Sequence, residues 1–274
     1  MDKVIAIQGA EGSNHHKVAR NFYGTSIQLK ECMSFDVLVD SLLDNSANMG
    51  VMALENTIAG SIIPNYALID KHNLHITNEE YLNIHHHLMA LKGQNIEDIK
   101  EVWSHPMALL QCKKFFKKHP HIKLVEDVDT AEVAKRIAEK NLEGIAAIAP
   151  KIAAEIFDLA IIEDEIQTIK DNSTRFVIVQ TDEPKLNEDV NKASLKFELN
   201  HKRGSLAAIL NVLSDCKMNL TKIQSLPVIE TPWKYSFFVD VTFDEYENYE
   251  KAKSVIQIMA EEFKILGTYK NGRK

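Results

Sequence analysis

The sequence predicts an α/β protein with largely parallel sheets, followed by a smaller domain of ferredoxin-like order. Two observations lead to this fold class. Strand and helix signals alternate over the first two-thirds of the 274 residues, up to a polar, charged break at residues 181–189. Beyond the break, residues 193–270 follow the order strand, helix, strand, strand, helix, strand. We therefore expect two domains.

In the first part, short apolar runs are each followed by a turn or a helix-start signal. Ser13 can cap a helix that reaches about Tyr23, and prolines at 64, 106 and 150 suit first turns. Asp129 and Glu132 have capping-box spacing. Ligands bind outside the strand ends of such sheets, so polar residues there are the candidates. The expected strands are residues 4–7, 49–54, 101–104, 144–149 and 176–179.

The second part contains two expected helices among four expected strands. Leu206, Ile209 and Leu213 share one face of the first helix, as a helix packed on a sheet requires. The expected helices are residues 204–216 and 249–263. The expected strands are residues 193–199, 220–228, 233–242 and 264–269, with a turn at residues 230–232.

Composition excludes several classes of protein. The net charge is −7 and the pI about 5.9, without a basic stripe, which argues against nucleic-acid binding. Cys32, Cys112 and Cys216 are too few and too scattered for a disulfide framework or a zinc site. The N-terminal apolar run is too short for a signal peptide, and no run is long enough to span a membrane. We expect a cytoplasmic protein with no membrane partner.

The richest candidate segment is Asn172-Ser173-Thr174-Arg175, just before an apolar strand. Arginine presents a planar fork suited to a carboxylate, and the amide and hydroxyl can donate to a hydroxyl or carbonyl. A strand-entry turn would explain the same residues equally well.

A second candidate segment, Glu55-Asn56, directly follows an expected buried strand. Gly60-Ser61 before a helix could present N–H groups to an anion, although simple capping by Ser61 is an equal alternative. A third candidate, Ser104 with Gln111, is weaker, because Ser104 could be an N-cap and Gln111 a surface amide. The histidines at 85–87 point to alternating strand faces, so we expect no metal site there.

Together, these segments resemble prephenate dehydratase. The resemblance rests on Asn-x-Thr-Arg-Phe at 172–176, Glu-Asn-Thr-Ile-x-Gly at 55–60, and the order and spacing of all the segments. Residues 204–227 look like the ACT domain that follows the catalytic part in this family. The matching segments are residues 5–22, 51–62, 102–111, 129–138 and 172–179.

The resemblance implies a catalytic region, residues 1–181, of two periplasmic-binding-protein-like lobes: about 1–77 with 167–181, and 78–166. It implies an ACT regulatory domain at 193–270. The implied reaction removes carbon dioxide and water from prephenate to give phenylpyruvate in phenylalanine biosynthesis, with no cofactor. Arogenate dehydratase and a non-catalytic amino-acid sensor are the alternatives.

The resemblance also assigns roles to residues. Thr174 would polarise the leaving hydroxyl, and Glu55 is a candidate acid if it is buried. The implied catalytic residues are Thr174, Glu55, Asn56, Ser104 and Gln111, and the implied substrate-binding residues are Arg175, Asn172, Ser173, Ser61 and Thr130.

The expected regulatory site departs from the family pattern. Gly-Ser-Leu-Ala at 204–207 stands where a Gly-Ala-Leu-type segment is usual, and Gln-Ser-Leu-Pro at 224–227 replaces Glu-Ser-Arg-Pro. Two charges are lost, so we expect weak or altered inhibition by L-phenylalanine in a homodimer or homotetramer. The expected allosteric residues are Gly204, Ser205, Leu206, Asn219, Leu220, Gln224, Ser225, Leu226 and Pro227.

Overall fold

The computed structural model describes residues 3–185, 189–200, 202–228, 231 and 234–273. The chain forms two compact units. The first contains residues up to 61 together with 81–176, and the second contains 62–80 together with the chain from 177 onward. The chain therefore passes between the units after Ser61, Glu80 and Phe176.

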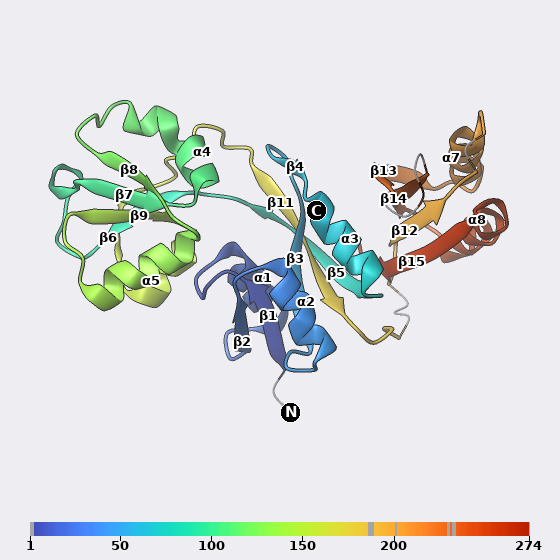
Figure 1. Cartoon of the computed structure of the whole chain (residues 1–274), viewed down its shortest axis with the longest axis horizontal. Coiled ribbons are helices and arrows are strands. Elements are labelled where there is room, and N and C mark those ends of the chain that lie inside the picture. The colour runs from blue at the N-terminus through green and yellow to red at the C-terminus, as the bar shows by residue number, and fades with distance from the viewer. Residues whose placement is uncertain (1–2, 186–188, 201, 229–230, 232–233, 274) are drawn as a thin grey trace. The chain divides into compact units, whose positions relative to one another are not determined.

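The first sheet is built from βα units at the N-terminus, with strand order β2-β1-β3-β11-β5 and β4 hairpinned onto β3 (Figure 1). β1 pairs in parallel with both β2 and β3, as the alternating pattern predicts. The unit boundary falls inside β5 and β11. The strands are β1 Val4–Gln8, β2 Gln28–Cys32, β3 Met49–Asn56, β4 Gly60–Ser61, β5 His75–Asn83 and β11 Ser173–Gln180, and the helices of the first unit here are α1 Asn14–Tyr23 and α2 Phe35–Leu43.

The second sheet has the order β10-β6-β9-β7-β8. β7 pairs in parallel with β8 and β9, whereas β6 runs antiparallel to β9 and β10. Leu88 and Ile148 pack with α4, and their neighbours Met89 and Ala147 pack with α5, so the two helices cover opposite faces (Figure 1). The elements are β6 His87–Ala90, a 3₁₀ turn at Ile96–Asp98, β7 Glu101–Ser104, α4 Pro106–Phe116, β8 Lys123–Glu126, α5 Thr130–Lys140, β9 Ile145–Ala149, α6 Lys151–Phe157 and β10 Ala160–Glu163.

The second unit contains the ferredoxin-like βαββαβ domain, an antiparallel sheet of order β13-β14-β12-β15. Phe197 and Val241 of the sheet pack with Ile209 and Leu213 of α7 and Ile256 of α8. This confirms the expected fold class, a mixed α/β region followed by a separate sheet domain. The elements of the unit are α3 Ile63–Lys71, β12 Lys192–Glu198, α7 Ser205–Asp215, β13 Asn219–Pro227, β14 Tyr235–Thr242, α8 Tyr246–Met259 and β15 Glu262–Tyr269.

Several element boundaries differ from expectation. The strand expected over 176–179 is β11, which begins three residues earlier, at Ser173. The helix expected over 249–263 is α8, which begins at Tyr246 and ends at Met259. It stops there because the next backbone N–H after Ala260, that of Glu261, donates to the Glu198 carbonyl at 2.9 Å and starts the pairing of β15. In the expected turn, Glu230 and Pro232 lie outside the described residues, as does Trp233 of the following strand.

Candidate active site

The site is centred on Asn56, the last residue of β3. Its Oδ1 accepts the backbone N–H groups of Ile58 at 2.9 Å and Ala59 at 2.8 Å. These two bonds fix the orientation of the amide. The Nδ2 group therefore faces the start of β11, where it donates to Oδ1 of Asn172, the residue just before the strand, at 2.7 Å and to Thr174 Oγ1 at 2.9 Å.

The network continues from Asn172 to α4. Asn172 Nδ2 donates to Gln111 Oε1 at 3.2 Å, and His86 Nε2 donates to the same oxygen at 2.7 Å. Gln167 Oε1 in turn accepts the backbone N–H of His86 at 2.9 Å. Burial lowers the pKa of His86, so its ring is neutral and one nitrogen carries the proton for Gln111.

His86 joins this network, although the three adjacent histidines led only to the expectation of no metal site. They were expected to alternate along a strand, and this is wrong: only His87 lies in a strand, at the start of β6, whereas His85 and His86 belong to the connection after β5. Which one contacts Gln111 depends on the packing of α4, and no local pattern reports that.

The geometry leaves Thr174 able to act as a donor. Its oxygen accepts the Asn56 N–H, so its own hydroxyl proton can be directed to another acceptor. Thr174 is 7% exposed and Asn172 is 1% exposed, so a group that reaches the Thr174 hydroxyl is largely removed from water. Hydrogen bonds are stronger in such a setting, which favours polarisation of a leaving hydroxyl.

Arg175 and Ser173 alternate with Thr174 along β11, so they point to the opposite face of the strand. Arg175 is only 2% exposed. The Ser173 hydroxyl donates to the Leu82 carbonyl at 3.4 Å, and its backbone exchanges two 2.9 Å hydrogen bonds with Thr57. The structure thus brings Thr174 together with Asn172, and the Ser173 carbonyl also accepts from Asn56 Nδ2, at 3.4 Å.

Glu55 and Ser61 lie opposite each other in the β3–β4 hairpin, and both are half-buried. A helix opens near Pro64, as expected: α3 begins at Ile63, with Ile62 at the N-cap and no side-chain cap. The alternative that Ser61 caps this helix is therefore wrong. The Gly60-Ser61 backbone is instead used in the hairpin.

Ser104 and Thr130 are also placed apart from the network. Ser104 is fully buried, and its hydroxyl donates to the Ile148 carbonyl at 2.8 Å. The alternative that Ser104 caps α4 is wrong, because His105 Nδ1 accepts the Met107 N–H there. Thr130 is the first residue of α5, next to its N-cap Asp129, as the spacing predicted.

The residues expected to bind an effector fall into two groups. Gly204 caps α7 with φ +87°, and Ser205 and Leu206 begin the helix and line a pocket with Lys234 and Phe237. The others lie on β13, the edge strand of its sheet, and none lines this pocket. Along β13, Asn219, Ser225 and Pro227 are exposed, whereas Leu220, Gln224 and Leu226 are half-buried.

The described part of the chain contains no group of three or more His, Cys, Asp or Glu side chains that could hold a metal ion. No helix among the described residues is long and apolar enough to cross a membrane.

Residues 5–184 match the family described as prephenate dehydratase. A relative from Arabidopsis thaliana, "Arogenate dehydratase/prephenate dehydratase 2, chloroplastic", is 35% identical over 97% of this chain and 72% of its own length. Two solved structures share the fold over 98% of this chain. A prephenate dehydratase from Arthrobacter aurescens in complex with L-Phe has a TM-score of 0.85 at 22% identity, over 90% of its length. GqqA, a quorum-quenching acylase, has a TM-score of 0.85 at 24% identity, over 98% of its length.

Two α/β sheets that carry a connected polar network, with a separate ferredoxin-like domain, define an α/β enzyme of the dehydratase kind. The chain belongs to the prephenate dehydratase family.

Proposed function

We propose that the chain converts prephenate to phenylpyruvate. The observation that carries this proposal is the network of Asn56, Asn172, Gln111 and Thr174, which presents one buried hydroxyl as a donor. Prephenate already contains the driving force, because loss of its ring carboxylate and hydroxyl produces an aromatic ring. The protein therefore needs only to hold the anion and assist the departing hydroxyl.

The reaction balances without a cofactor. The bond from the ring to the carboxylate breaks, carbon dioxide leaves, and the electron pair enters the ring. The bond from the ring to the hydroxyl breaks at the opposite carbon, and the oxygen leaves as water after it gains a proton. Thr174 stabilises the charge that develops on this oxygen by donating a hydrogen bond. A threonine hydroxyl is a poor acid, so water or a carboxyl group supplies the proton, and Glu55, the residue before Asn56 on β3, is the carboxyl we propose.

We assign residues 1–181 to the catalytic region and 193–270 to an ACT regulatory domain. The βαββαβ order and the antiparallel sheet support the second assignment. L-phenylalanine is the proposed effector, because a relative of the same fold is described in complex with L-Phe. The edge strand β13 offers unpaired backbone groups to a second copy, which supports a homodimer or homotetramer.

The test is a turnover assay on purified protein with prephenate and, side by side, arogenate. We expect phenylpyruvate from prephenate at a rate far above its spontaneous formation. Faster conversion of arogenate would reassign the substrate within the same family. Tight binding of either compound without any product would instead indicate a sensor and overturn the proposed activity.

A further inference from the structure

The ferredoxin-like sheet has one apolar face and one polar face, and both are buried. Along β12, Ala193, Leu195 and Phe197 face the helices α7 and α8. The alternate residues Lys192 and Lys196 point the other way, yet they are 1% and 6% exposed. An antiparallel sheet usually leaves its polar face in water. In this chain, the segment 62–80, which contains α3 and the start of β5, occupies that face.

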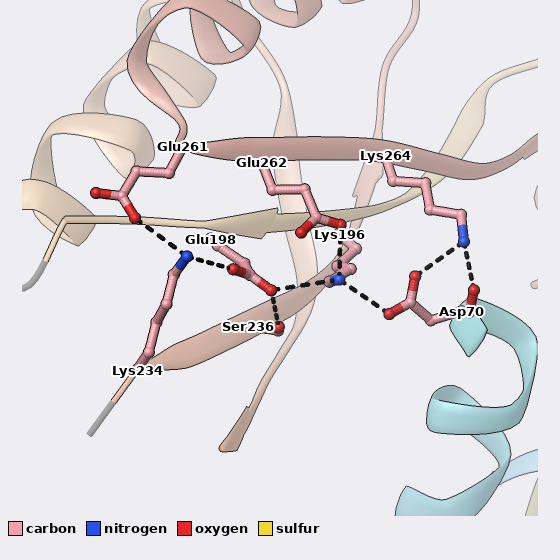
Figure 2. Close-up of polar contacts among 8 residues, drawn as sticks. All are labelled: Asp70, Lys196, Glu198, Lys234, Ser236, Glu261, Glu262 and Lys264. Carbon is pink, nitrogen blue, oxygen red and sulfur yellow. Dashed lines mark hydrogen bonds and ion pairs between the residues drawn. The ribbon is translucent and has the colours of Figure 1, made fainter. Parts of the chain in front are cut away.

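The main contact is made by Asp70, near the end of α3 (Figure 2). Its Oδ2 lies 2.9 Å from Lys196 Nζ, and its Oδ1 lies 2.9 Å from Lys264 Nζ. Lys264 also donates to the Asp70 carbonyl. A cation there complements the negative end of the helix and satisfies one of its last carbonyls.

The ion pairs extend from Asp70 across the polar face of the sheet. Figure 2 shows the Asp70 cluster, which consists of Asp70, Lys196, Glu198, Lys234, Ser236, Glu261, Glu262 and Lys264. Lys196 Nζ is 2.9 Å from Glu262 and 3.4 Å from Glu198, which is itself 2.8 Å from Lys234. Burial alone would lower the pKa of Lys196, but hydrogen bonds to Glu262 and Asp70 outweigh it and raise the pKa. Lys196 is therefore charged, and its charge is matched on several sides.

A second group of contacts holds the start of β5. Lys192 Nζ lies 2.8 Å from both carboxylate oxygens of Glu79, and the two side chains are 2% and 0% exposed. At Gly267 of β15, an added Cβ would lie 2.1 Å from the Ile76 carbonyl oxygen, so the two backbones are in direct contact.

These contacts constrain geometry, because a buried charge that loses its partner is strongly unfavourable. Segment 62–80 is accordingly grouped with the C-terminal part of the chain. In sequence, however, this segment directly continues the hairpin that follows Asn56. A displacement of the ferredoxin-like domain must therefore carry α3 with it and pull on the hairpin.

We propose that the Asp70 cluster fastens segment 62–80 to the ferredoxin-like domain, so that this domain controls the order of the hairpin after Asn56. This coupling is mechanical and does not depend on which effector the domain binds. Its effect on catalysis rests on the proposed function, whereas its effect on the order of the hairpin does not.

The test is hydrogen exchange, measured by mass spectrometry, on the full chain and on Asp70→Asn. We expect amides in residues 57–80 to exchange about 10-fold faster in the variant, since each lost charged hydrogen bond lowers local stability. Gly267→Ala, which forces the two backbones apart without touching a charge, should act in the same direction. Lys264→Met removes only one of the two lysines that are paired with Asp70. This variant is measured instead if Asp70→Asn does not fold.

The matched control is Glu247→Gln, which breaks an exposed ion pair with Lys251 at 2.9 Å within α8. Exchange over 57–80 should stay at the wild-type rate in this variant. Unchanged exchange over 57–80 in Asp70→Asn and Gly267→Ala would overturn the inference. Prephenate turnover is followed in parallel. If the variants show the expected increase in exchange but the wild-type chain does not turn over prephenate, the proposed function is overturned while the coupling is supported.

Discussion

At the scale of single residues, the Thr174 hydroxyl is defined by what surrounds it. Two backbone N–H groups orient the Asn56 amide, and that amide occupies one acceptor position on Thr174. The hydroxyl proton is thereby left for a ligand. The neighbours of Thr174 thus set the direction in which its hydroxyl can donate a hydrogen bond.

Thr174→Ala should lower kcat for prephenate by about 100-fold, a typical loss for one transition-state hydrogen-bond donor. The fold should survive, because the change removes a hydroxyl and a methyl at the start of β11. Thr174→Ser keeps the hydroxyl and should retain most of the activity. Steady-state kinetics with a thermal melt of each variant provide the measurement. Full turnover by Thr174→Ala would remove Thr174 from the mechanism.

His16 should make the fold sensitive to acid. Burial, and then the charge of Arg20, lower its pKa to about 4, and its Nδ1 accepts the Gly12 N–H at 3.0 Å. In the unfolded chain His16 has its ordinary pKa near 6.5, so the unfolded state binds the proton at a higher pH than the folded state does. The contribution of neutral His16 to stability is complete above pH 6.5 and is lost as the pH falls toward about 4.

Between pH 7 and pH 5 we expect His16 to contribute a loss of about 2 kcal/mol in the free energy of unfolding. Urea unfolding at both pH values measures this change in the free energy of unfolding. His16→Gln removes the titrating group, so the drop between the two pH values should be smaller in this variant. An equal drop in both proteins would contradict the assignment.

At the scale of elements, the turn after β1 and the start of α5 depend on each other. Asp129 Oδ1 accepts the N–H groups of Ala131 and Glu132, both at 2.9 Å, and so caps α5. Its Oδ2 lies 2.7 Å from the place where a Cβ on Gly9 would be. Gly9 also has φ +87°, which disfavours any other residue. The glycine is therefore required by both backbone conformation and packing.

Gly9→Ala should destabilise the fold by about 1–3 kcal/mol through the strained φ and the clash. Asp129→Ala should cost about 1–2 kcal/mol through loss of the cap. The double variant should lose less than the sum, because the clash disappears with the carboxylate. Urea unfolding of the four proteins gives the coupling directly. Strict additivity would show that the two residues do not meet.

At the scale of the whole molecule, both site segments lie just before crossings between the compact units. Asn56 precedes the crossing after Ser61, and Thr174 precedes the one after Phe176. Residues 62–80 belong to the same compact unit as the C-terminal part, whereas the family resemblance places them in the catalytic region. The two assignments of residues 62–80 agree if this segment connects the hairpin after Asn56 to the ferredoxin-like domain, as the proposed coupling requires.

The predicted effector response belongs to this scale. The Gln224 and Leu226 side chains lack the charges usual in the family, so we expect weak inhibition by L-phenylalanine. Restoring them with Gln224→Glu and Leu226→Arg together should lower the phenylalanine needed for half-inhibition by about 10-fold, as charged hydrogen bonds return. Inhibition curves measured together with light scattering test this. Strong inhibition of the unaltered chain would show that the two departures are tolerated.

The sequence by itself determined the βαββαβ order of the second part, the caps at Ser13 and Asp129, and the segments that carry the family pattern. These features depend on neighbours along the chain, so local preferences are enough to predict them. It could not decide whether residues 172–176 were a turn or a site.

Only the tertiary structure decided which side chains meet. It joined Asn56 to Asn172 and Thr174, and Gln111 to His86. It also paired Asp70 with two lysines far along the chain. The physical reason is that hydrogen bonds and ion pairs between distant residues depend on packing, and many acids and bases in the sequence are equivalent until the fold selects among them.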